Sequence, residues 1–182
     1  FDGHDNDPTV EGPKIYKRNG YYYIFAPAGG VSTGWQLVLR LKYIFGPYER
    51  KMVMHQCKTT INGPHQGVWV DTPSGENWFF HFQDKGAYGR IVHLQPLKWV
   101  NDWPVIGEDL DGDGCGEPIY SYGVPKLVSS DKRNYIQSND EFNSAKIGKH
   151  WQWQANPEQS WAMATSDGYY RMYSVLDTAQ LS

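Results

Sequence analysis

Cysteine, charge of one sign and long apolar runs are all scarce in this chain of 182 residues. Its two cysteines, Cys57 and Cys115, are too few for a disulfide framework and lack the spacing of zinc ligands. A net charge of -3 with 20% charged residues excludes long disordered tails and supplies no basic patch for nucleic acid. Every apolar run is too short to cross a bilayer, so we expect neither a nucleic-acid nor a membrane partner.

An initiator methionine and a recognisable signal peptide are also missing from the first residues. We therefore expect that Phe1 is not the natural start of the protein. The length allows one domain or two small ones, and a hydrophobic content of 40% is enough for a core.

Aromatic residues, glycine and proline are abundant. The chain has 8 Trp, 13 Tyr, 19 Gly and 11 Pro, and aromatic residues make up 15% of it. Aromatic strands separated by Gly and Pro turns are typical of an all-β protein. Exposed rings would also suit a surface that stacks on sugar faces or nucleobases, although we expect most of them in the core.

Two blocks of the sequence repeat a pattern of four short strands. The first block predicts strands at 14–17, 21–26, 36–41 and around 48–54, and the second at 65–70, 77–83, 90–98 and near 105. Asn19-Gly20 is a strong hairpin signal, and a Gly-Pro pair opens each block. Four antiparallel strands in a period of about 45–50 residues indicate propeller blades. Two blades cannot close a ring, so we expect further blades from sequence that is absent here.

The remaining segments divide the chain further. The first ten residues are polar and turn-rich, and we interpret them as a connector. Residues 109–138 are acidic and Gly-rich at first, and we interpret them as a linker. A hairpin signal at Ser166-Asp167-Gly168 indicates a second β domain. We therefore predict the C-terminal part of a propeller at 1–108, a linker at 109–138 and the start of a β-sandwich at 139–182.

Several stretches resemble glycoside hydrolase family 43. They are EGPKIYKRNGYYYIFAPAGG, then LVLR and FGPYE, then GPHQGVWVDTPSGENWFFHFQDKGAYGRIVHLQPLKWVNDWPVIG, and finally DEFNSAKIGKHWQWQANP. The resemblance implies a five-bladed β-propeller that acts on xylose- and arabinose-containing polysaccharides. The stretches resemble above all the bacterial xylosidase-like members of the family, which have a C-terminal concanavalin-like sandwich. This chain would then hold the fourth and fifth blades and the beginning of the sandwich.

Glu11 is the predicted catalytic residue. Glycoside hydrolysis with inversion needs a protonated carboxyl group beside the leaving oxygen and a carboxylate base on the opposite face. From spacing alone Glu11 could be a solvated loop residue, but the resemblance makes it the general acid of the EGP motif, and such an acid is expected to have a raised pKa. The resemblance places the base Asp and a pKa-tuning Asp in earlier blades. We assign Asp2, Asp5 and Asp7 to the connector instead.

Three further residues are predicted to bind substrate. The resemblance places His65 near the propeller axis, where the histidine of some members holds a calcium ion through water and that of others only forms hydrogen bonds; a structural histidine is the alternative. It places Arg90 in the sugar pocket, where a guanidinium can hold two hydroxyls; a surface arginine is the alternative. Trp35 is a candidate sugar platform, or it covers its glycine-rich loop. His81 and His93 are interpreted as core histidines.

Residues 109–114 fit the first half of a calcium-binding loop, D-x-D-x-D-G. The twelfth position is Tyr120 rather than Glu, and Glu117 stands at position nine. The favoured interpretation is an acidic solvated turn, so no cofactor is expected with certainty and Ca²⁺ is the one candidate.

These residues favour an inverting β-xylosidase or α-L-arabinofuranosidase whose base Asp is absent from this chain. Its partners would be xylan- or arabinan-derived saccharides and the remaining blades. The alternative is a non-catalytic carbohydrate-binding propeller or sandwich protein. Secretion or a periplasmic location is expected rather than a cytoplasmic one.

Overall fold

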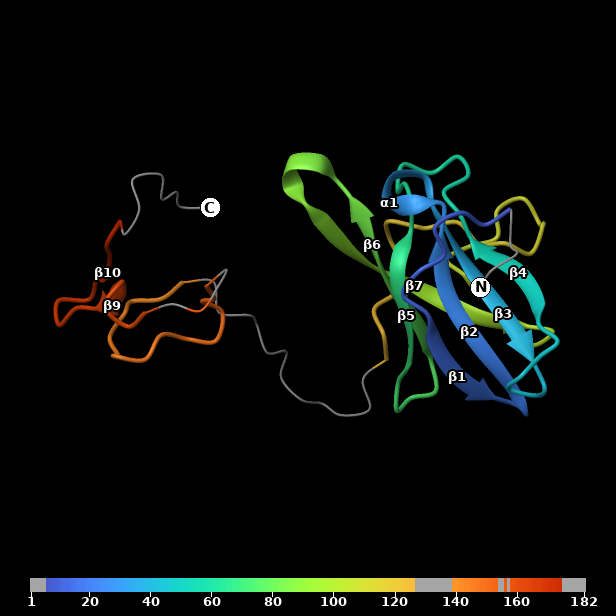
Figure 1. Cartoon of the computed structure of the whole chain (residues 1–182), viewed down its shortest axis with the longest axis horizontal. Coiled ribbons are helices and arrows are strands. Elements are labelled where there is room, and N and C mark those ends of the chain that lie inside the picture. The colour runs from blue at the N-terminus through green and yellow to red at the C-terminus, as the bar shows by residue number, and fades with distance from the viewer. Residues whose placement is uncertain (1–5, 127–138, 154–155, 157, 175–182) are drawn as a thin grey trace. The chain divides into compact units, whose positions relative to one another are not determined.

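The computed structural model describes residues 6–126, 139–153, 156 and 158–174 (Figure 1). The chain divides into two compact units, Phe1–Ser130 and Asp131–Ser182. Asp2, Asp5 and the predicted linker from residue 127 onward lie outside the described residues. In the part of the chain that is described, no helix is long and apolar enough to cross a bilayer.

The first sheet of the larger unit contains four antiparallel strands in sequence order. They are β1 (Lys14–Arg18), β2 (Tyr21–Ala28), β3 (Trp35–Leu41) and β4 (Glu49–Met54). Asn19 and Gly20, which join β1 to β2, have φ angles of 50° and 79°. Two consecutive positive φ angles match the twist of a tight hairpin, which explains why the Asn-Gly pair marks this turn. Between β2 and β3 the expected loop contains one helical turn, α1 (Gly30–Thr33).

The second sheet repeats this order with β5 (His65–Asp71), β6 (Asn77–Asp84), β7 (Arg90–Val100) and β8 (Trp103–Ile106). The 3₁₀ turn η1 (Gly86–Tyr88) joins β6 to β7, and this hairpin reaches beyond the other strands (Figure 1). An antiparallel sheet of four strands in sequence order is the repeating unit of a propeller, and this chain contains two such sheets. The predicted all-β class is therefore confirmed.

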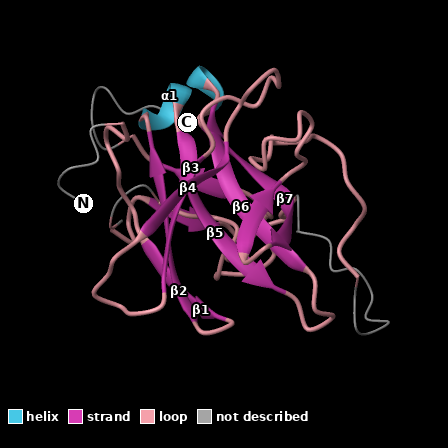
Figure 2. Cartoon of the chain, turned by 90° about the vertical axis from the view of Figure 1, so that its right-hand side faces the viewer, coloured by secondary structure: helices cyan, strands magenta, loops and turns pink. Residues whose placement is uncertain are grey.

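The core lies between the two sheets, whose strands Figure 2 shows side by side with α1 at one end. Aromatic and aliphatic side chains from both sheets form it, namely Tyr23, Phe25, Val38, Val53, Met54, Phe79, Leu97 and Ile106. The Phe25 ring stacks on Phe79 at 6.0 Å between centroids. Each such aromatic pair adds about 0.5–1.5 kcal/mol beyond area burial. These aromatic residues thus serve packing between the blades. The expectation that most rings lie in the core is wrong, because more of the described rings are exposed, Tyr43, Phe45 and Tyr88 among them, than are buried.

Residues 109–119, which fall in the predicted linker 109–138, contact both sheets. Gly116 forms a bridge with Met54 at the edge of the first sheet, and the buried Gln95 side chain bonds both backbone groups of Ile119. Glu117 is also buried and accepts the backbone N–H of Leu110. Backbone groups that pair with both sheets hold this segment in the first unit.

The smaller unit contains one hairpin in its described residues, β9 (Ala162–Ala164) and β10 (Tyr170–Met172). Gly168, at φ 81°, lies in the turn that the sequence predicts. Phe142 stacks on Tyr170 at 5.2 Å between centroids. A two-stranded hairpin with a few stacked rings is a small core by itself.

Candidate active site around Glu11

Glu11 lies in the segment that leads into β1. Its backbone N–H donates to the Pro27 carbonyl at 3.2 Å, and the Pro8 carbonyl accepts from the Gly29 N–H at 2.8 Å. The segment therefore runs along the end of β2 and the start of the α1 loop. These two backbone bonds place the Glu11 carboxylate at the start of β1, where β5 begins alongside.

His65, the first residue of β5, meets the Glu11 carboxylate. Its Nε2 lies 2.5 Å from Glu11 Oε1, and the His65 side chain is 0% exposed whereas that of Glu11 is 51% exposed. Among the described residues no group pairs with the buried His65 Nδ1. A side chain on Gly34 would meet Nδ1 at 3.2 Å and backbone oxygens at 2.3 Å and 2.4 Å, so only glycine fits there. The α1 loop thus closes over the imidazole.

Gln66 is a site residue that the sequence reasoning missed. It lies in a β-bulge between His65 and Val68, with its backbone at φ 51°. Its side-chain amide lies against the Cα of Gly12, because a Cβ there would come within 2.2 Å of Gln66 Oε1. The amide also acts as a donor toward the Glu11 carboxylate and so lowers its pKa. A bulge leaves no periodic signal in sequence, which explains the omission.

Arg90 begins β7 and is exposed. Its guanidinium lies 4.7 Å from the centroid of the Phe82 ring, and Phe82 in turn meets the His65 ring edge-on at 5.8 Å. The Arg90 charge also acts on the Glu11 carboxylate. The structure therefore brings three of the four predicted site residues, Glu11, His65 and Arg90, to one end of the two sheets.

The pKa of Glu11 is lowered, mainly because His65 donates a hydrogen bond to its carboxylate. Partial burial raises the pKa of Glu11. The electrostatic attraction of His65, the Gln66 amide as a donor and the charge of Arg90 lower it further. The expectation of a raised pKa is thus wrong for these residues by themselves. His65, Gln66 and Arg90 each favour the charged form of the carboxylate.

Trp35 lies at the start of β3 against the α1 loop. A Cβ on Gly29 would meet the Trp35 ring at 2.5 Å, so the ring covers this glycine. Its indole N–H donates to Asp7 Oδ1 at 3.1 Å. Trp35 also borders an open cavity of about 410 Å³, so one ring both covers the loop and lines a hollow.

Asp7 is more than part of a connector. Its side chain is completely buried and accepts two hydrogen bonds from the Arg50 guanidinium besides the one from Trp35. A buried carboxylate needs such partners, because its desolvation is otherwise costly. Asp7 therefore fixes the segment that carries Glu11, four residues further on.

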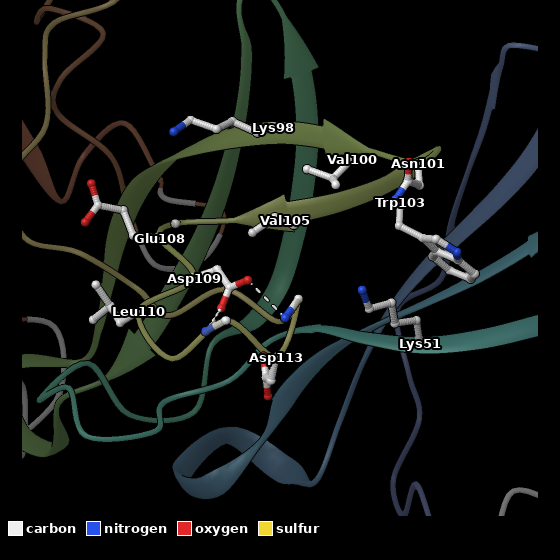
Figure 3. A pocket seen from close by; sticks show the side chains of 13 residues that line it. Lys51, Lys98, Val100, Asn101, Trp103, Val105, Glu108, Asp109, Leu110 and Asp113 are labelled. Carbon is white, nitrogen blue, oxygen red and sulfur yellow. Dashed lines mark hydrogen bonds between the residues drawn. The ribbon is translucent and has the colours of Figure 1, made fainter.

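The acidic loop at 109–114 lies elsewhere, beside a cavity of about 550 Å³ near β8 and Lys51 (Figure 3). Carboxylate oxygens of Asp109, Asp111 and Asp113 lie within 4.8 Å of one another. Asp109 accepts the backbone N–H groups of Gly112 and Gly114, so part of its capacity is used within the turn. We derive no calcium site from this loop, and none of the four predicted site residues lines the cavity.

Comparison with known proteins defines first the class and then the family. Residues 4–104 match the family described as glycosyl hydrolases family 43. Residues 139–181 match the family described as the β-xylosidase C-terminal concanavalin A-like domain. The fold is thus that of propeller blades followed by part of a concanavalin-like domain. The chain belongs to glycosyl hydrolase family 43.

Named relatives support this assignment. The chain is 50% identical over 163 residues to a protein of Xylanibacter ruminicola that is provisionally named a β-xylosidase. It is 34% identical over 183 residues to a β-xylosidase of Formosa agariphila and 28% identical over 183 residues to a non-reducing end α-L-arabinofuranosidase of Bacteroides ovatus. These matches cover 89%, 90% and 90% of this chain but only 31%, 31% and 32% of the relatives.

Solved structures share the fold. A bifunctional family 43 protein of Bacteroides eggerthii is 32% identical, with a TM-score of 0.68, over 93% of this chain and 21% of the other. A family 43 protein of Bacillus licheniformis is 26% identical, with a TM-score of 0.70, over 90% of this chain and 33% of the other. The arrangement of the described sheets is therefore that of family 43 propellers.

Proposed function

We propose that this chain supplies the general acid of an inverting glycosidase that hydrolyses xylose- or arabinose-containing saccharides, and that Glu11 is that acid. The observation that carries the proposal is the half-exposed Glu11 carboxylate held by the buried His65 at the start of β1. The contact lies inside the segment that matches glycosyl hydrolase family 43. A carboxyl group that is exposed on one side and anchored on the other can reach a glycosidic oxygen.

The neighbouring residues take separate roles in this proposal. Arg90 is exposed beside Glu11, and its fork of N–H donors suits a pair of sugar hydroxyls. His65 orients Glu11 and lies below the sugar rather than beside it, because its side chain is completely buried. Trp35 supports the site indirectly, because its ring covers the α1 loop that closes over His65 and the cavity that it lines contains neither Glu11 nor Arg90.

Catalysis also needs a base and a raised pKa of Glu11, and we propose that further blades supply both. The chain covers 31% of two of the relatives that it matches, which leaves room for those blades. A second carboxylate facing Glu11 would oppose its ionisation and offset the effect of His65, Gln66 and Arg90. The exposed rings and methyls of Phe80, Val92 and Leu94 on the β6–β7 hairpin offer an apolar face for another blade.

The test is Glu11→Gln in the complete protein that contains this chain. Hydrolysis of xylobiose or arabino-oligosaccharides, whose leaving groups are poor, should fall by about two to four decades. An aryl xyloside with a good leaving group needs less protonation and should lose much less. Equal loss on both substrates would contradict the acid role.

A non-catalytic carbohydrate-binding protein is the second candidate, and the lowered pKa of Glu11 favours it. A carboxylate that stays charged can accept hydrogen bonds from sugar hydroxyls but cannot protonate a leaving group. In that case the complete protein would bind xylo-oligosaccharides in calorimetry without hydrolysing them.

A further inference from the structure

We infer that Gln66 is a positioning residue for the carboxylate of Glu11, so that the bulge of β5 grips this side chain from two consecutive residues. The inference rests on the proposed function, because it assigns Gln66 a part in the same reaction. The His65 ring hydrogen-bonds Glu11, and the Gln66 side-chain amide lies against the adjoining Gly12 and acts on the Glu11 carboxylate. Consecutive residues of a regular strand point to opposite faces, so two neighbours can contact one carboxylate only where the strand is irregular.

The backbone at Gln66 adopts a conformation that is uncommon for a residue with a side chain. Its φ angle of 51° is in the left-handed region, which is strained for a residue with a side chain. Glycine would adopt this conformation freely, and Gly67 follows directly. Gln66 thus places a side chain where glycine would fit more easily, and the contacts of that side chain lead to Gly12 and Glu11.

The side-chain amide of Gln66 fits closely against Gly12. Gly12, next to Glu11, has a φ angle of 51° and leaves no space for a side chain, because a Cβ would lie 2.2 Å from Oε1 and 3.0 Å from Nε2 of Gln66. The glycine of the Glu11-Gly12-Pro13 motif thus makes room for the amide. Gln66 and Gly12 fit each other, and Glu11 is held between this contact and His65.

The groups around Glu11 differ in charge. The groups that face it are His65 of β5, Arg90 of β7 and the Gln66 amide, while Lys14 of β1 bonds the neighbouring Gly12 carbonyl. Of these, the Gln66 amide is neutral, so it can orient the carboxylate without adding a net charge to the site. Its N–H donor favours the ionised carboxylate, which affects the pH at which an acid catalyst is active.

The experiment is a double-mutant cycle in the complete protein, with Gln66→Gly and Glu11→Gln made singly and together. Glycine keeps the left-handed backbone and removes the Gln66 side chain together with its amide. We expect Gln66→Gly to lower kcat on xylobiose about tenfold with KM within about twofold, and to affect an aryl xyloside less, since misplacing a catalytic group mainly lowers kcat. In the Glu11→Gln background it should cause no further loss, because the group that it positions is gone.

A pH profile gives the second readout. Activity of an acid catalyst falls as pH rises through its pKa, so loss of the Gln66 donor should move the alkaline limb to higher pH. Gln66→Glu, which keeps the shape but adds a like charge, should move it further. Asn19→Gly is the matched control: it removes an amide from a left-handed position at the opposite end of β1 and should leave the limb in place.

The outcomes separate the two proposals. An inactive parent protein, or a Glu11→Gln variant as active as the parent, would overturn the proposed function. An active parent in which Gln66→Gly leaves kcat and the alkaline limb unchanged would overturn the role of Gln66 alone. Additive losses in the double variant would also overturn it, since they would show that Gln66 acts independently of Glu11.

Discussion

Glu11 and His65 are joined by a side-chain hydrogen bond of 2.5 Å although 54 residues separate them in the sequence. One partner is completely buried and the other is half exposed. The contact links the start of the first blade to the start of the second, so the packing of the blades determines the geometry of the proposed acid. A change in that packing would therefore alter the site without touching its residues.

Arg90→Ala in the complete protein should lower kcat/KM on xylobiose by about one to two decades, because a charge-assisted hydrogen bond is worth roughly 1.5–3 kcal/mol. The melting temperature should change little, since Arg90 is exposed and its guanidinium only covers the Phe82 ring from the solvent side. Lys85→Ala, which removes another exposed charge from the same hairpin, is the control and should retain full efficiency. Unchanged kcat/KM in Arg90→Ala would exclude Arg90 from the sugar site.

Asp7→Ala should lower the free energy of unfolding by about 1–3 kcal/mol, a range reduced for the partial exposure of Arg50. The substitution leaves the Arg50 guanidinium and the Trp35 indole N–H without their buried acceptor. Asp7→Asn keeps an acceptor for Trp35 and should lose less. Urea denaturation followed by tryptophan fluorescence measures both variants, and an unaffected midpoint in Asp7→Ala would return Asp7 to the role of a simple connector.

His81 should make the fold sensitive to acid. Burial lowers the pKa of His81 to about 4, whereas an unfolded histidine titrates near 6.5. The folded state therefore binds this proton less readily, so the stabilisation is complete above about pH 6.5 and is lost as pH falls towards 4; it amounts to about 3 kcal/mol as an order of magnitude.

The matched variant is His81→Gln, with melting temperatures recorded from pH 8 to pH 4.5. Its melting temperature should fall less steeply with acid than that of the parent. The difference between the two proteins at pH 8 measures the change in packing alone. Identical slopes would mean that His81 does not carry the acid sensitivity.

The 182-residue chain studied by itself should self-associate and show no hydrolysis of xylobiose. Phe80, Val92 and Leu94 are exposed together on the β6–β7 hairpin, and an uncovered apolar face of a sheet favours association. Val92→Lys should reduce association in sedimentation velocity. Leu110→Lys, an exposed leucine outside the hairpin, should leave it unchanged. A monomeric, cooperatively folded and hydrolytic chain would contradict the requirement for further blades.

The sequence by itself determined the local elements of this protein. Alternating apolar residues, the Asn19-Gly20 pair and the Gly-Pro pairs depend on neighbours in the chain, so the strands of both sheets and their order follow from them. The family resemblance placed Glu11, His65 and Arg90 in one site, and the structure brings these three together.

Only the tertiary structure decided which distant groups meet. The sequence predicts Asp7 as a connector residue because the two residues that enclose it, Arg50 and Trp35, lie 43 and 28 residues away. Residues 109–119 fall in the predicted linker, 109–138, because their partners, Met54 and Gln95, lie far away in the sequence on two different sheets. The direction of the Glu11 pKa shift and the role of Gln66 likewise depend on the spatial arrangement of charges and on an irregular strand. Burial, charge and backbone irregularity are properties of packed neighbours, and a pattern along one chain does not contain them.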